Sequence, residues 1–156
     1  MRNVELRTRV WRGYTVSVLC GELDTGDAVD TAAAVAALAA GGQQLIIDLE
    51  PLDFIDCHAV GALLGVRETA RQAGGDVLLA AARGSVLRLL TLLGVPGVHA
   101  SVAAAADSAD TRDALRRAVS IARFGRAVLS GALYWMMAWR AAVPGSRAGT
   151  RSRSPQ

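Results

Sequence analysis

Residues 45–64, LIIDLEPLDFIDCHAVGALL, decide how the rest of this chain is organised. The stretch opens as a short apolar run that ends in carboxylates and a proline, which is typical of a buried strand leading into a surface loop. From Asp56 onward the spacing of the apolar residues predicts a helix. Asp56 is a favourable N-cap residue, so we expect Cys57 and His58 at an exposed helix start with free backbone N–H groups. A strand, a loop and such a helix start form a candidate functional site.

The flanking segments predict a hairpin followed by helices and strands in alternation. This order indicates an α/β fold, a mixed sheet of about four to five strands packed with about four helices, plus a C-terminal helical extension. Besides the strand that begins at Leu45, the expected strands are residues 4–10, 14–20, 77–81 and 98–102. The expected helices begin at Asp24 or Thr25, at Asp56, at Ser85, and at about Ala104 or Ser108.

Two of these helices have expected faces. The alanine-rich first helix is expected to bury one side and to end at the glycine pair 41–42. Its expected buried residues are Val29, Ala32, Val35, Ala36 and Leu38. The expected polar face of the helix that follows Asp56 comprises Arg67, Glu68, Arg71 and Gln72.

Charge is distributed unevenly along the 156 residues. Residues 1–110 hold 8 arginines and 13 acidic residues, whereas residues 111–156 hold 9 arginines and one acidic residue. The net charge of +3 therefore combines an acidic first part with a basic second part, which suggests different partners or an internal association between them.

The sequence indicates a cytoplasmic protein. No segment reaches the roughly 18 apolar residues that span a bilayer, and the N-terminus lacks the charged-then-apolar pattern of a signal peptide. Cys20 lies in an expected strand and Cys57 at an expected helix start, so both are expected as free thiols rather than as a disulfide framework.

We expect three parts in the chain: a domain at residues 1–110, a basic and partly apolar helical extension at 111–143, and a disordered tail at 144–156. Several roles for the basic segment stay open. In one alternative, its apolar side packs on the domain or on a second copy, as in a homodimer. In another, its Trp, Tyr and Met residues, which are flanked by arginines, lie on a membrane surface. Nucleic-acid binding is disfavoured because the arginines are dispersed and no recognition fold accompanies them. A tail without a role is a further alternative.

The residues around Asp56 resemble a known family. Asp53-Phe54-Ile55-Asp56, followed by residues 57–61 (CHAVG) and a leucine-rich helix, is similar to the STAS domain. Bacterial anti-sigma factor antagonists and the cytoplasmic ends of sulphate transporters share this domain. Residues 21–24 (GELD) and 89–95 (LLTLLGV) are similar to two further family landmarks in the same order, and the resemblance covers roughly residues 4–120. The STAS fold has the same order of elements as the expected fold.

The resemblance implies a protein-binding module, not an enzyme, that acts as an anti-sigma factor antagonist. Such an antagonist sequesters an anti-sigma factor, a kinase-like ATP-binding protein, and so releases a sigma factor. In these antagonists the residue two positions after the aspartate is a serine or threonine that the kinase phosphorylates. His58 stands at that position here, Cys57 replaces a small hydroxyl residue, and Ala59 replaces a glycine. The resemblance therefore implies that the usual phosphorylation switch is absent.

The resemblance also implies a partner-binding surface. Its expected residues are Asp24, Asp53, Asp56, Cys57, His58, Ala59 and Val60. Helix capping alone accounts for Asp24 and Asp56 without a partner. Phe54 and Ile55 are expected to pack in or beside the core.

Alternatives for Cys57 and His58 stay open. In one alternative His58 shapes a binding face, and in another it is itself phosphorylated. In a third, Cys57 is a reactive thiol, because helix N-termini stabilise thiolates. Metal binding lacks ligands, since His99 is the only other histidine. No catalytic set of nucleophile, base and acid and no phosphate-binding glycine loop is discernible, so we expect no catalytic residue, cofactor or metal. The alternative function is a membrane-peripheral scaffold that acts through the basic aromatic C-terminal helix.

Overall fold

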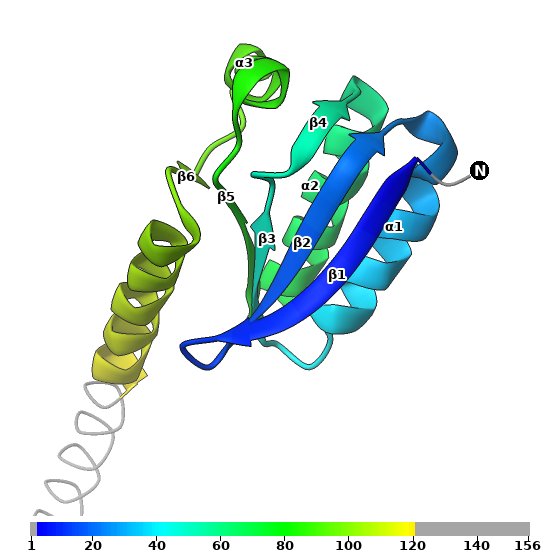
Figure 1. Cartoon of the computed structure of the whole chain (residues 1–156). Helices are drawn as coiled ribbons and strands as arrows, with labels where there is room; N and C mark the ends of the chain where they lie inside the picture. The colour runs from blue at the N-terminus through cyan, green and yellow to red at the C-terminus, as the bar shows by residue number, and fades with distance from the viewer. Residues whose placement is uncertain (1–2, 121–156) are drawn as a thin grey trace, which may run out of the picture. The chain divides into compact units, whose positions relative to one another are not determined.

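The computed structural model describes residues 3–120 of the chain (Figure 1). The compact unit that holds the sheet spans Met1–Arg112. Most of the expected extension at 111–143 and all of the expected tail at 144–156 lie outside the described residues, so that division of the chain stays a prediction.

A mixed sheet forms the centre of this unit, and its strand order is β1-β2-β3-β5-β6 with β4 paired to β2. The antiparallel hairpin is confirmed, and the other strand pairs are parallel. The strands are β1 (Val4–Trp11), β2 (Tyr14–Leu23), β3 (Gln44–Asp48), β4 (Leu52–Ile55), β5 (Asp76–Ala80) and β6 (Val98–His99). The helices are α1 (Thr25–Leu38), α2 (Cys57–Gln72) and α3 (Gly84–Leu92), and residues 102–120 are also helical. The expected α/β architecture is confirmed.

The two faces of the sheet bury different partners. Residues 45 and 47 of β3 point into the larger core, which α1 and α2 cover on one side of the sheet (Figure 1). Residue 46 points the opposite way, because successive strand side chains alternate between faces. There it packs against the small residues Ala105, Ala106 and Ala109 of the helix at residues 102–120, which is the last described helix and is called the last helix below. Alanines let this helix approach the sheet closely.

Strand β4 differs from the expectation, because the residues after Pro51 were assigned to a loop. They pair with β2 instead, with Leu52 opposite Gly21 and Ile55 opposite Leu23. Gly21 has φ +92° and a Cβ built on it would lie 2.4 Å from the carbonyl oxygen of Asn3, so only glycine fits this crossing. The extra strand places the loop before α2 directly beside the loop before α1.

The expected buried face of α1 was also partly wrong. Val29 is 67% exposed and Ala36 is exposed, whereas Ala28, Thr31 and Val35 are buried. Ala32 and Leu38 are half-buried, so only Val35 of the five expected residues lies fully in the core. An alanine-rich helix has little contrast between its faces, and the sequence therefore did not define its rotation.

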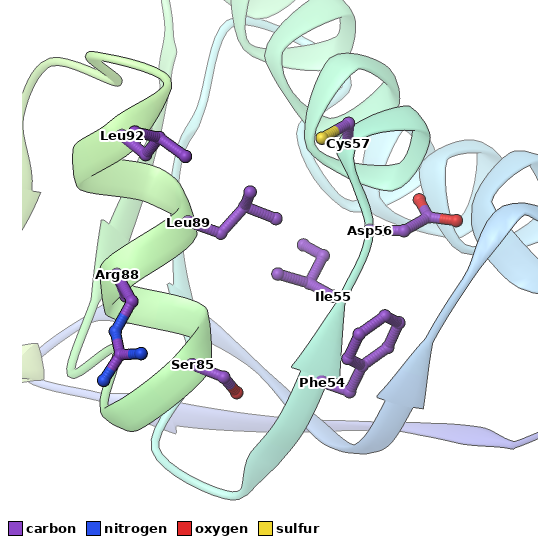
Figure 2. A pocket seen from close by; sticks show the side chains of 8 residues that line it. All are labelled: Phe54, Ile55, Asp56, Cys57, Ser85, Arg88, Leu89 and Leu92. Atoms are coloured by element: carbon purple, nitrogen blue, oxygen red, sulfur yellow. The ribbon is translucent and has the colours of Figure 1, made fainter.

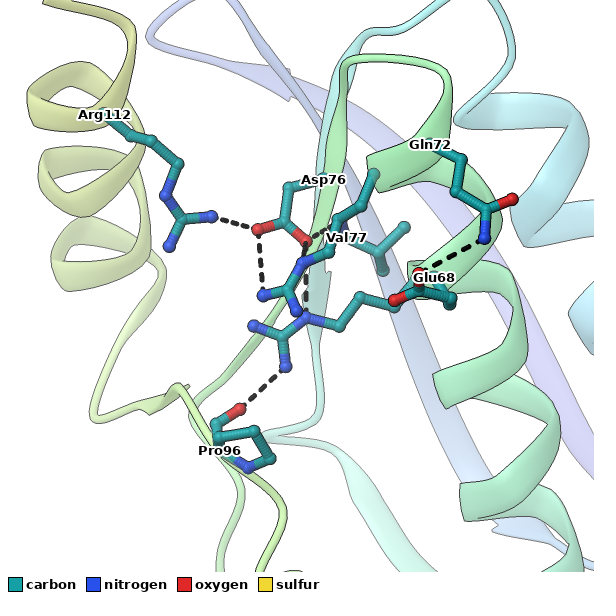
Figure 3. Close-up of polar contacts among 8 residues, drawn as sticks. Glu68, Gln72, Asp76, Val77, Pro96 and Arg112 are labelled. Carbon is teal, nitrogen blue, oxygen red and sulfur yellow. Dashed lines mark hydrogen bonds and ion pairs between the residues drawn. The ribbon is translucent and has the colours of Figure 1, made fainter. Parts of the chain in front are cut away.

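Arg67 was expected on a polar helix face but is 4% exposed. It binds the buried Asp76, which Figure 3 shows paired with Arg112. Its Nε donates to Oδ1 of the buried Asp76 at 3.3 Å and its Nη1 donates to the carbonyl of Pro96 at 2.7 Å. Arg71 donates to the same carboxylate from α2, and Arg112 donates to it from the last helix. Burial alone raises the pKa of Asp76, but the arginines outweigh it and the net direction is down. One carboxylate therefore joins α2, β5 and the last helix.

Candidate functional site

The loop between β4 and α2 is held by Asp56, as expected from its place before the helix. The N–H of Ala59 donates to Asp56 Oδ1 at 2.7 Å, which caps α2. The other oxygen, Oδ2, accepts from the backbone N–H of Thr25 at 2.8 Å and from its hydroxyl at 2.7 Å. These hydrogen bonds, with that of Ala59 the strongest contribution, lower the pKa of Asp56 below its ordinary value. Asp56 therefore stays ionised and joins the first turns of two helices.

Asp24 caps the other helix of this pair. It accepts from the N–H of Gly26 at 2.9 Å, so the expected cap is confirmed. Leu23 and Ile55 are paired across the sheet, and the N–H of Asp56 donates to the carbonyl of Leu23 at 3.1 Å. The two helix starts consequently lie side by side at the same end of the sheet, where parallel strands β2 and β4 both end.

The expected site residues divide into an exposed group and a buried group. Asp53, Cys57 and His58 are exposed, and Asp24 and Asp56 are half-buried. Ala59 is 0% exposed and Val60 is 2% exposed, because both face the core from the first turn of α2. The side chains offered to the surface are thus those of Asp24, Asp53, Asp56, Cys57 and His58, which we call the docking face.

Two hydroxyl groups lie close to this face in space, although sequence reasoning found none at the helix start. The hydroxyl of Thr25 is bound to Asp56, and the hydroxyl of Ser85 donates to the carbonyl of Asp53 at 2.9 Å. Ser85 was expected to cap α3, but the helix begins at Gly84 with Arg83 in the N-cap position and no side-chain cap. Neither the contact of Thr25 with Asp56 nor that of Ser85 with Asp53 has a signal in the linear sequence, since both depend on how the strands pair.

A groove of about 400 Å³ lies between α3 on one side and the end of β4 with the start of α2 on the other (Figure 2). Ile55 and Leu89 point toward one another across it, and Cys57 lies near one end. Sequence reasoning missed this groove, although the run of leucines in α3 was more apolar than one buried helix face requires. The residues that line the groove are Phe54, Ile55, Asp56, Cys57, Ser85, Arg88, Leu89 and Leu92.

Other classes of site find little support in the part of the chain that the structure describes. Among residues 3–120, no group of three or more His, Cys, Asp or Glu side chains is arranged to hold a metal ion. No described helix is both long and apolar enough to cross a bilayer. Cys20 and Cys57 are both free, and only Cys57 is exposed.

Residues 5–105 match the family model of the STAS domain. The chain belongs to the STAS domain family. The family resemblance expected from the residues around Asp56 is thereby confirmed, and the observed mixed sheet and helices agree with it.

Solved structures of STAS proteins are similar to this chain. SpoIIAA of Bacillus, an anti-sigma factor antagonist, is 25% identical in its unphosphorylated form, with a TM-score of 0.57 over 69% of this chain and 96% of SpoIIAA. An anti-sigma factor antagonist from Mycobacterium paratuberculosis is 22% identical, with a TM-score of 0.59 over 67% of this chain and 92% of that protein. The murine anion transporter Slc26a9 is 19% identical, with a TM-score of 0.57 over 71% of this chain and 22% of the transporter. No curated protein matches the sequence.

Proposed function

We propose that this protein is an anti-sigma factor antagonist that binds a kinase-like, ATP-binding anti-sigma factor through its docking face and so releases a sigma factor. The observation that carries the proposal is the pair of adjacent helix starts, joined by Asp56, that presents Cys57 and His58 to solvent. The 25% sequence identity between this chain and SpoIIAA, across nearly the whole of that antagonist, supports the same role. The role is one of binding, without catalysis.

The proposed mechanism is mutual exclusion without the usual switch. His58 stands where the family resemblance places a phosphorylated serine or threonine, and an imidazole is no substrate for a kinase of hydroxyl groups. The hydroxyl of Thr25 lies nearby but donates to Asp56 at 2.7 Å, so a phosphate there would place two anions in contact. Ser85 is likewise engaged with the carbonyl of Asp53. The protein would therefore stay competent to bind in the presence of ATP and would act through its abundance.

A comparison of surface variants tests the proposed face. We expect His58→Asp to weaken the complex with the cognate anti-sigma factor at least about tenfold, because a central contact is replaced by an unpartnered charge. Val29→Asp is the matched control, since Val29 is 67% exposed on α1 and lies outside the docking face. Isothermal titration calorimetry against the candidate anti-sigma factors of the source genome measures both. Equal affinities for the two variants would place the interface elsewhere.

A further inference from the structure

The groove that α3 forms with the end of β4 and the start of α2 has the dimensions and chemistry of a ligand site. Its volume of about 400 Å³ lies within the roughly 300–1,000 Å³ typical of small-molecule sites. Ile55 and Leu89 face one another across it, and Leu92 lies near one end (Figure 2). Leu92 is 80% exposed, so a bound molecule with an apolar chain would remove a large apolar side chain from water.

The charged and hydroxyl side chains that line the groove are already engaged, with one exception. The carboxylate of Asp56 accepts its hydrogen bonds from Thr25 and Ala59 and is turned toward α1, away from the groove (Figure 2). The hydroxyl of Ser85 donates to the carbonyl of Asp53.

Arg88 is the exception. Within residues 3–120 its guanidinium makes no hydrogen bond and no ion pair, whereas Arg83, at the start of the same helix, pairs with Glu50 at 2.6 Å. A guanidinium presents a planar fork of N–H donors that matches a carboxylate with two parallel hydrogen bonds. An apolar groove beside such an unpaired group is complementary to an anion that carries an apolar chain.

We propose that this groove binds a single-chain amphiphile with a carboxylate head group, of the fatty-acid class. The apolar chain lies on Ile55, Leu89 and Leu92, and the carboxylate pairs with Arg88 at the solvent boundary. In Figure 2 the guanidinium of Arg88 points away from Ile55 and Leu89. Its flexible stem lets it turn to the head group at the rim, so the charged ends of both molecules stay partly hydrated while the apolar parts are buried.

Occupancy of the groove has a consequence for partner binding, and this step alone rests on the proposed function. Asp56 and Cys57 belong both to the groove and to the docking face. A bound amphiphile would therefore cover part of the surface that the anti-sigma factor needs. Such competition would give the protein a control by ligand where the phosphorylation switch is absent.

Decanoate is the probe for the binding step, titrated into the full-length protein below its micelle concentration. We expect saturable binding at one site, and weaker binding of decanol, which has the same chain without the charge. Arg88→Gln should weaken decanoate binding about tenfold through loss of a charge-assisted hydrogen bond. Arg83→Gln is the matched control, because it removes an equal charge from the same helix outside the groove.

Alkylation of Cys57 gives a second, independent measurement. Iodoacetamide labelling, followed by peptide mass spectrometry, should slow at Cys57 when decanoate is bound and stay unchanged at the less exposed Cys20. Non-saturable binding, equal binding of decanoate and decanol, or equal effects of Arg88→Gln and Arg83→Gln would overturn the proposal.

The test also separates a ligand site from a protein contact. If decanoate does not bind, while Leu92→Asp weakens the complex with the anti-sigma factor, the groove belongs to the protein interface and the amphiphile proposal fails with the proposed function intact. If decanoate binds and no anti-sigma factor does, the proposed function fails and the ligand site stands.

Discussion

Asp56 is the residue on which the geometry of the docking face depends. One of its oxygens caps α2 through Ala59, and the other ties Thr25, the first residue of α1, to the same carboxylate. An ionised carboxylate near two helix N-termini is favoured by both helix dipoles. The backbone N–H groups at these two helix starts are thereby fixed in position relative to one another.

Replacing Asp56 by alanine should lower the free energy of unfolding by about 1–2 kcal/mol, because both helix starts lose their acceptor. The pKa of Asp56 is lowered in the folded state, so its contribution is present at neutral pH and is lost as the pH falls through that folded-state value. The difference between wild type and Asp56→Ala should therefore narrow in acid. Urea unfolding of both proteins across a pH series measures this difference in the free energy of unfolding.

Asp53→Ala is the control for this experiment. Asp53 is exposed, and only its backbone carbonyl accepts a hydrogen bond from Ser85, so the truncation leaves that contact in place. A pH-independent difference for Asp56→Ala, or an equal loss in Asp53→Ala, would contradict the capping role.

Under the proposed function, His58 is the residue that separates this protein from an antagonist switched by phosphorylation. His58→Ser restores a hydroxyl at the exposed start of α2, and we expect the cognate anti-sigma kinase to phosphorylate it in the presence of ATP and then to release it. His58→Ala is the matched control that should bind without gaining phosphate. Intact mass and native mass spectrometry report both events. Failure of His58→Ser to gain a phosphoryl group would argue against the equivalence of this position to the family phosphoacceptor.

At this scale, helix caps made by neighbouring residues were predictable from the sequence, whereas contacts between distant parts of the chain were not. Asp24 and Asp56 were expected as caps because capping depends on the residues that directly follow. The link from Asp56 to Thr25 and the burial of Arg67 had no local signal, since each partner is supplied by another part of the fold. Sequence alone assigned Arg67 to the solvent, where an unpaired arginine belongs.

Among the elements, those with strong periodicity were predicted and those shaped by their neighbours were not. The alternation of residues 4–10 and the apolar runs of β3 and β5 defined their strands. Strand β4 was missed because Pro51 and the surrounding carboxylates are typical of a loop, and pairing with β2 overrides that preference. The rotation of α1 was missed because alanine dominates both of its faces.

The contact between α2, β5 and the last helix depends on Asp76. We expect Asp76→Asn to lower the free energy of unfolding by about 3–5 kcal/mol, because it leaves the buried Arg67 without a counter-charge. Chemical denaturation measures the loss. Glu5→Gln is the matched control, since it removes a carboxylate from the exposed pair with Arg7, and it should leave stability unchanged. Similar losses in the two variants would contradict the structural role of the Asp76 network.

At the scale of the whole molecule, the two candidate functions, antagonist and membrane-peripheral scaffold, differ in whether they need the basic C-terminal segment. The proposed antagonist acts through the docking face, so deleting residues 121–156 should leave its affinity for the anti-sigma factor unchanged. A membrane-peripheral scaffold instead requires the basic aromatic segment, and its full-length form should sediment with anionic vesicles. The scaffold alternative fails if that deletion does not change sedimentation.

Persistence of the complex with a cognate anti-sigma kinase in the presence of ATP tests the central claim most directly. The purified full-length protein is incubated with each candidate kinase and Mg-ATP, and native and intact masses are recorded over time. We predict a complex that persists while the protein gains no phosphoryl group. Phosphate on the protein with loss of the complex would contradict the account, and peptide mapping would then show whether Thr25, Ser85 or His58 carries it.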